Sequence, residues 1–149
     1  MTDPNPAIIM GCDHAAFEMK EKLKAYLLQN GHAVEDVGAH STASVHYPDY
    51  GQKVAEGISE GLYARGILLC GTGLGMSMVA NRFPGVRAAL CHDLFGAAMS
   101  RKHNDANILV LGGRVTGETL AEEIVKVWLA TPFEGGRHQQ RLDMIDRIN

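Results

Sequence analysis

The sequence lacks several features that would each have indicated a class of protein. It has only three cysteines, Cys12, Cys70 and Cys91, which are too far apart for a C-x-x-C metal site or a disulfide framework. No apolar run approaches the roughly 20 residues that cross a membrane. The opening MTDPNPA has no charged stretch followed by a long apolar one, as a secretory signal would. We therefore expect a cytoplasmic protein with no membrane partner.

Bias towards one sign of charge is also absent. Fourteen Lys and Arg against 17 Asp and Glu leave a net charge of -3, and the basic residues form no long run. This balance indicates no nucleic acid partner. The hydrophobic content of 46% and charged content of 21% are typical of a soluble globular protein, and 149 residues suit one domain. A single domain over residues 1–149 is the prediction.

Short apolar runs alternate with longer amphipathic segments along the whole chain. The predicted strands are 7–12, 32–37, 66–70, 86–91 and 107–111. The predicted helices are 16–27, one opening at 48–49, a short one at 76–82, 93–101, 117–129 and 135–149. Residues 38–46 are expected to form a surface excursion. This alternation predicts an α/β fold, a doubly wound three-layer sandwich with a five-stranded parallel, Rossmann-like sheet and a C-terminal helix.

Ligands of such sheets bind beyond the carboxyl ends of the strands. Asp13 and His14 follow the first predicted strand, Cys70 ends the third, and Arg114 follows the fifth. One interpretation is that Asp13 merely caps the helix that follows it. The other is that the Asp13–His14 pair orients a hydroxylated ligand. These residues are the first candidates for a binding site.

The stretch LLCGTGLGMS, residues 68–77, places a glycine loop directly after Cys70. Glycines let main-chain N–H groups approach an anion. Three known phosphate-binding loops do not match. A P-loop would need a lysine after the glycine loop, and a dinucleotide fingerprint would need a glycine at position 76, where Met76 stands. A cysteine-phosphatase loop would need an arginine at that same position. The interpretations that remain are a plain glycine-rich turn and an oxyanion cradle.

The three cysteines have different neighbours in the sequence. Cys70 alone could be a small core residue, but its place beside main-chain donors favours a reactive thiolate. Cys12 and Cys91 have no glycine loop after them, so we assign both to packing.

Further candidates lie in RKHNDAN and GGRHQQR. His103 could move a proton near neutral pH, although His103 and its neighbours could simply end a helix. Arg137 and Arg141 are four residues apart and so share one helix face. That face is either a solvated basic surface or, together with Arg114, a clamp for a phosphate.

Taken together, the stretches GCDHAAFEMK, YPDYG, LLCGTGLGMSMVANR, SRKHNDANILVLGGRV and EGGRHQQR resemble the signature stretches of the ribose-5-phosphate isomerase type B family. The resemblance runs from about residue 8 to 149. It implies interconversion of ribose 5-phosphate and ribulose 5-phosphate through a cis-enediolate, in the pentose phosphate pathway, without a metal or another cofactor. Allose-6-phosphate and galactose-6-phosphate isomerases belong to the same family.

The resemblance also implies roles for single residues. Cys70 would be the base that moves the proton between C1 and C2, and His103 would help to open the sugar ring. Family members without this cysteine use a glutamate at the place where Met76 stands here. The implied substrate-binding residues are Asp13, His14, Gly71, Thr72, Gly73, Leu74, Gly75, Asn104, Arg114, Arg137 and Arg141.

One expectation comes from topology alone. Cys70 follows a strand, whereas His103 follows a helix and precedes a strand, so the two should lie at opposite edges of the sheet, about 17 Å apart. We therefore expect His103 to complete the site of a neighbouring chain in a homodimer or a dimer of dimers. The alternatives are a hexose 6-phosphate isomerase and, in a different class, a non-catalytic nucleotide-binding module.

Overall fold

Five parallel strands form the centre of the molecule, in the order β2-β1-β3-β5-β4. The computed structural model describes residues 3–148. The strands are β1 (Asn5–Cys12), β2 (Val34–Asp36), β3 (Tyr63–Cys70), β4 (Ala88–Leu90) and β5 (Ile108–Gly112). The helices are the short 3-10 helix η1 (His14–Ala16), then α1 (Phe17–Gln29), α2 (Tyr47–Ser59), α3 (Leu74–Ala80), α4 (Leu94–Lys102), α5 (Glu118–Ala130) and α6 (Arg137–Asp146).

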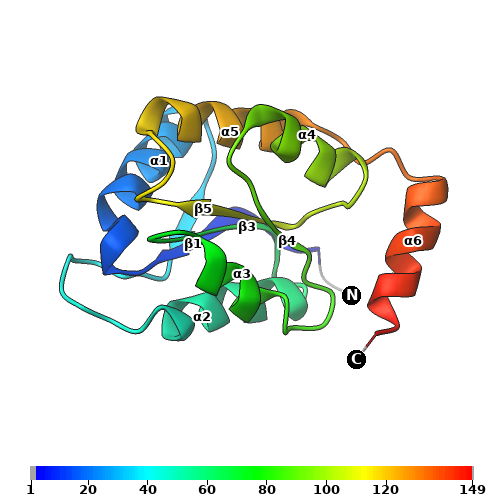
Figure 1. The fold of residues 1–149 in the computed structure, drawn as a ribbon, viewed down its shortest axis with the longest axis horizontal. Helices are drawn as coiled ribbons and strands as arrows, with labels where there is room; N and C mark the ends of the chain where they lie inside the picture. The colour runs from blue at the N-terminus through cyan, green and yellow to red at the C-terminus, as the bar shows by residue number, and fades with distance from the viewer. Residues whose placement is uncertain (1–2, 149) are drawn as a thin grey trace.

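Helices cover both faces of this sheet. Helices α1, α4 and α5 lie on one face, and α2 and α3 lie on the other (Figure 1). Every residue of β5 is buried, as is the second half of β3, because both strands are covered on both sides. The predicted doubly wound α/β fold with a five-stranded parallel sheet is therefore confirmed.

The predicted elements differ from the observed ones mainly at their ends. Strand β3 begins at Tyr63 rather than Gly66, because its polar first half pairs with β1 through Tyr63 and Arg65. The strands β2 and β4, at the two edges of the sheet, keep only three residues each. Helix α3 begins at Leu74, directly after the glycine loop, and α6 ends at Asp146. The part of the last predicted helix at Asn149 lies outside the described residues.

The chain order creates a crevice between β1 and β3. From β1 the chain goes to β2 on one side and then to β3 on the other side, and such a switch point is where ligands bind in doubly wound sheets. Cys12 pairs with Leu69 across this junction, and the Asp13 N–H donates to the Leu69 carbonyl at 3.2 Å. Asp13 and Cys70 therefore leave the sheet side by side.

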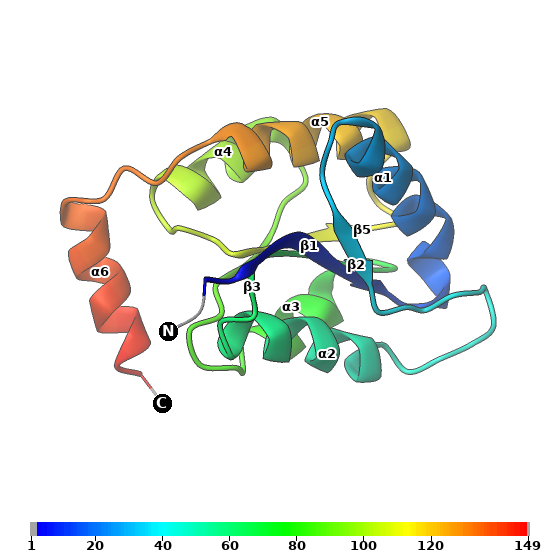
Figure 2. The ribbon, with the colours of Figure 1, turned by 180° about the vertical axis from the view of Figure 1, so that it is seen from behind.

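Helix α6 stands apart from the layers. Figures 1 and 2 show it beside the chain termini, joined to α5 by an extended segment. Two of its side chains, His138 and Leu142, are buried, while Met144 and Ile145 are exposed. Helix α6 thus keeps apolar side chains that this chain does not cover.

The expected surface excursion at residues 38–46 is wrong for its first two residues. Gly38 and Ala39 are buried and hydrogen-bond on both sides of Cys12, so they extend the end of the sheet. The fully buried Lys20 ammonium holds this segment by donating to Asp36 Oδ1 at 2.6 Å and to the Ala39 carbonyl at 2.7 Å. The end of β1 therefore rests on a buried ion pair.

The Lys20–Asp36 pair predicts how stability depends on pH. Burial alone would raise the pKa of Asp36, but hydrogen bonds from Lys20 and Lys24 outweigh burial and lower it to about 2. Because this folded-state pKa lies below the unfolded value of about 3.9, the contribution is complete above pH 4 and is lost as the pH falls towards 2. Asp36→Asn should lower the free energy of unfolding at pH 7 by about 3 kcal/mol, because it removes the carboxylate nearest to the buried Lys20 charge and leaves only Glu21 Oε1, at 3.4 Å.

Urea unfolding at pH 7, 4 and 2.5 tests this prediction, with Glu60→Gln as the control at an exposed carboxylate. We expect the control to follow the wild type and Asp36→Asn to lose part of the acid dependence. An Asp36→Asn protein as stable as the wild type at pH 7 would contradict the assignment.

Candidate functional site

The carboxyl ends of β1, β3 and β5 bring one group of predicted site residues together. Cys70, the last residue of β3, pairs with Gly112, the last residue of β5. The main chain of Arg114 donates to the Gly71 carbonyl at 2.9 Å, and Gly113 donates to the Cys70 carbonyl at 2.8 Å. Arg114, the glycine loop and Cys70 therefore lie next to one another, beside Asp13.

The sequence leaves open whether Cys70 is a core residue or a thiol beside main-chain donors, and the structure shows features of both. The Cys70 side chain is only 5% exposed and packs with Val54 and Val110 in the apolar layer between the sheet and α2. Its sulfur also accepts the Gly73 N–H at 3.2 Å. The thiol thus lies in the wall of the core and faces the glycine loop through a main-chain donor.

The glycine loop depends on the left-handed conformation of Gly73, whose φ is +81°. A Cβ atom there would lie 2.5 Å from Leu90 Cδ1 and 3.2 Å from the Leu111 main chain, so the loop is pressed against the end of β5. Thr72 closes the turn, since its hydroxyl accepts the Leu74 N–H at 3.2 Å. The loop is therefore a packed structure rather than an open turn.

Tyr47 is a residue of this site that the sequence analysis missed. It is the first residue of α2, and a Cβ atom at Gly75 would clash with its ring. Tyr47 therefore covers the far end of the glycine loop. Only the motif YPDYG hinted at it, and a tyrosine before a helix-opening proline does not show where its ring will lie.

Asp13 and His14 have defined local partners. Asp13 is buried and caps η1 by accepting the Ala15 N–H at 3.0 Å, as the capping interpretation expects. His14 Nδ1 accepts the Val45 N–H at 3.1 Å. Because Nδ1 is the acceptor, a neutral His14 carries its proton on Nε2. The later part of the 38–46 segment thus sets the tautomer of a candidate ligand-binding group.

A second group of predicted residues lies at the opposite end of the sheet. His103 ends α4, and its ring stacks on that of His138 with centroids 4.2 Å apart. Burial, and then the charges of His103 and Arg137, lower the pKa of His138. Arg141 follows one turn later on α6, and both arginines are exposed.

The two groups stay apart within one chain. The five residues of β5 separate the end of α4, with His103 and Asn104, from Gly112 next to Cys70, a span of about 13 Å along the strand. Figure 1 shows α6 and the end of α4 on the side away from the loop that follows β5. The structure therefore separates Cys70 from His103 in one chain, as the topology predicts.

Asp105 is the second residue that the sequence analysis left without a role. It adopts a φ of +45°, and its carboxylate binds Arg101 Nη1 at 2.8 Å and Arg87 Nη2 at 3.4 Å. Asp105 thereby fixes the turn that presents His103 and Asn104. An arginine four residues earlier was a possible signal, but the φ value was not visible in the sequence.

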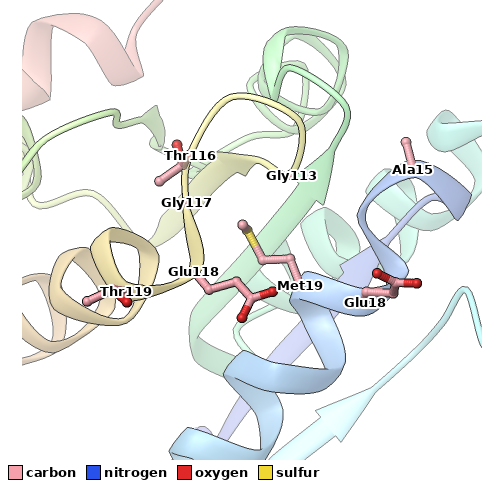
Figure 3. Close-up of a pocket in the computed structure, with 8 residues that line it drawn as sticks. All are labelled: Ala15, Glu18, Met19, Gly113, Thr116, Gly117, Glu118 and Thr119. Atoms are coloured by element: carbon pink, nitrogen blue, oxygen red, sulfur yellow. The ribbon is translucent and has the colours of Figure 1, made fainter.

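A separate pocket of about 430 Å³ lies beside the group that contains Cys70 and Arg114. It opens between the start of α1 and the loop after β5 (Figure 3). Glu18 and Glu118 line it together with Thr116 and Gly113. Two carboxylates make it unsuitable for an anionic ligand. Arg114 and the glycine loop are the better place for one.

The fold and the residues at its switch point define a class, an α/β protein that binds a small polar ligand beyond its parallel strands. Within residues 3–148, no helix combines the length and the apolar character needed to cross a membrane. The ribose/galactose isomerase family matches residues 8–145. The chain belongs to this family, and the resemblance seen in the sequence is confirmed.

Individual relatives support this membership over nearly the whole chain. Ribose-5-phosphate isomerase B of Escherichia coli is 45% identical over 141 residues, covering 95% of each protein. The crystal structure of a ribose 5-phosphate isomerase from Thermotoga maritima is 54% identical, covers 97% of this chain and 99% of its own, and superposes with a TM-score of 0.94. The D-erythrulose-4-phosphate isomerase of Pectobacterium atrosepticum is 44% identical over 140 residues, 93% of this chain and 92% of that protein.

The packing of Gly73 predicts the outcome of a matched pair of substitutions. Gly73→Ala should lower the free energy of unfolding by about 3 kcal/mol or more, because strain at positive φ adds to overlap with Leu90 and Leu111. Gly85 also has a positive φ, of +75°, but open space around it, so Gly85→Ala should cost only about 1 kcal/mol. Equal losses in urea unfolding would show that Gly73 is not packed as described.

Proposed function

We propose that this protein interconverts ribose 5-phosphate and ribulose 5-phosphate, acting as one isomerase domain over residues 1–149. The observation that supports this most is the Cys70 sulfur, which receives the Gly73 N–H beside Asp13 and Arg114. A base next to oriented main-chain donors suits proton transfer between the two carbons adjacent to an oxygen that becomes negative. The named isomerases among the relatives support the same assignment.

The proposed reaction uses these groups in order. The Cys70 thiolate takes the proton from C2 of the open-chain aldose, and the electron pair forms a cis-enediolate whose negative charge lies on O1. The resulting thiol returns the proton to C1, and the O2 hydroxyl proton passes to O1, so that C2 becomes the ketone and O1 becomes a hydroxyl. Main-chain N–H groups of the glycine loop other than those of Gly73 and Leu74, which donate to Cys70 Sγ and Thr72 Oγ1, stabilise the charged oxygen. One such donor is worth about 10²–10³-fold.

His14 and the arginines have supporting parts in this proposal. A neutral His14 donates from Nε2 to a sugar oxygen, since Nδ1 is already engaged by Val45. Arg114 of this chain binds the phosphate together with Arg137 and Arg141 of the partner subunit, and paired guanidinium groups suit this ligand. Binding energy gained at the phosphate then positions the distant reacting carbons.

The site is completed by a second chain in our proposal. His103 of the partner subunit, with the partner's Asn104, opens the sugar ring at the Cys70 of this chain. A groove of about 420 Å³ along β4 is lined by Asn104, Ala88 and Ile145. Large apolar side chains are exposed on α3 and α4, with Met78 68% and Phe95 74% accessible. Uncovered apolar surface beside an edge strand suits a homodimer. We place the protein in the cytoplasm, because all three thiols are unpaired.

Replacing the proposed base tests the reaction. Cys70→Ala should lower kcat by at least about 10³-fold, because it removes the group that moves the proton. Cys91→Ala is the matched control, a buried thiol outside the site, and should keep its rate within a few fold. Ketopentose formation is measured with a chelator present. A Cys70→Ala enzyme with the full rate would refute Cys70 as the base, and a wild type that binds ATP or NAD without turnover would favour the nucleotide-binding alternative.

Mixed dimers test whether the site is shared. Cys70→Ala and His103→Ala chains should each be inactive alone, yet co-refolding them should restore about a quarter of wild-type activity, because half of the dimers then carry one intact site out of two. Wild-type chains taken through the same procedure provide the reference. A mixture that stays inactive while the reference recovers would place both residues in the site of one chain.

Substrate length is tested by comparing kcat/KM for sugar phosphates of four, five and six carbons. We expect ribose 5-phosphate to exceed both D-erythrulose 4-phosphate and allose 6-phosphate by at least about tenfold, because phosphate and carbonyl must reach fixed arginines and Cys70 together. A larger kcat/KM for either alternative would change the assigned substrate but not the chemistry.

A further inference from the structure

Three potential metal ligands lie together at the amino-end side of the sheet. Among the residues that the structure describes, the donor atoms of His103, Glu134 and His138 lie within 4.8 Å of one another. The group joins the end of α4, the segment after α5 and the first turn of α6. Neither the isomerase chemistry nor the packing of the fold requires a carboxylate beside the two stacked imidazoles.

The spacing of these atoms suits a small divalent ion. Zinc binds nitrogen and oxygen at about 2.0–2.2 Å, so neighbouring donors in a tetrahedral site are about 3.4 Å apart. His103 Nε2 and Glu134 Oε1 are already 3.8 Å apart. Glu134 is half exposed, and its flexible side chain can close the remaining gap. Two histidines and one carboxylate leave a fourth position open for water.

The two imidazoles lie next to each other before any ion arrives. Their rings are stacked within 11° of parallel, so the partly exposed His103 ring must turn to direct its nitrogen at an ion shared with His138, which is only 6% exposed. A neutral imidazole is the form that binds metals. Arg137 and Arg141 act against a cation, since their charges also reach His138. Their repulsion predicts a reversible site rather than one that is permanently occupied.

We propose that His103, Glu134 and His138 bind a divalent transition-metal ion, Zn²⁺ in particular, and that the bound ion inhibits the isomerase. Binding needs only the geometry above, whereas inhibition rests on the proposed function of His103. A His103 nitrogen that ligates a metal cannot exchange a proton with a sugar oxygen. The ion would therefore block ring opening at the site to which His103 contributes.

Zinc titration of chelator-treated protein, followed with a competing metal indicator, tests the binding. We expect one ion per chain, and affinity at least tenfold weaker in Glu134→Gln and in His138→Ala. His32→Ala, at an exposed histidine outside the cluster, and Cys70→Ser should bind as the wild type does. Absence of saturable binding, unchanged affinity in both cluster variants, or loss of the ion in Cys70→Ser would overturn the site.

Rate measurements separate the site from the proposed function. Zinc should inhibit ribose 5-phosphate isomerisation reversibly, and Glu134→Gln should need at least tenfold more zinc for the same fractional loss of its own metal-free rate. Full activity at saturating zinc would overturn the inhibition. A protein without isomerase activity that still binds zinc in the predicted pattern would refute the proposed function and leave the metal site standing.

Discussion

The contact between the Gly73 N–H and the Cys70 sulfur is the interaction on which the functional site depends. It forms only because Gly73 adopts a left-handed conformation that brings the loop back over the end of β3. The same conformation presses the loop against Leu90 and Leu111, with no room for a side chain. One glycine therefore couples the packing of β4 and β5 to the surroundings of the thiol. The Cys70 thiol can lie at the boundary of the apolar core because the loop supplies its polar contact.

The end of the neighbouring strand β1 is held by a buried ion pair rather than by the packing of a glycine. The buried Lys20 binds both Asp36 and the Ala39 carbonyl, and Ala39 in turn hydrogen-bonds with Cys12. This chain of contacts fixes the position from which Asp13 and His14 leave β1. The segment then continues to Val45, whose N–H sets the tautomer of His14. A polar network inside the fold thus positions side chains that face the crevice.

Much of the fold was predictable from the sequence, because parallel strands covered on both faces appear as continuous apolar runs. The runs around Leu68 and Val110 are such strands, and the spacing of apolar residues identified the helices. The polar half of β3 was missed, since Tyr63 and Arg65 pair through their main chains and have no apolar pattern. The sequence also predicted that Asp13, Cys70 and Arg114 lie at the carboxyl ends of the strands. It could not place Tyr47 over Gly75, because that contact joins two distant segments.

The separation between Cys70 and His103 links the fold to the proposed assembly. A five-residue strand stands between the two groups, so the proposed mechanism requires two chains to build one site. A crystal structure with bound ribulose 5-phosphate tests this central claim most directly. We predict Cys70 Sγ within about 3.5 Å of C1 and C2, with His103 of the partner subunit at a ring-opening oxygen of the same sugar. A sugar bound far from Cys70, or contacted by one chain alone, would contradict it.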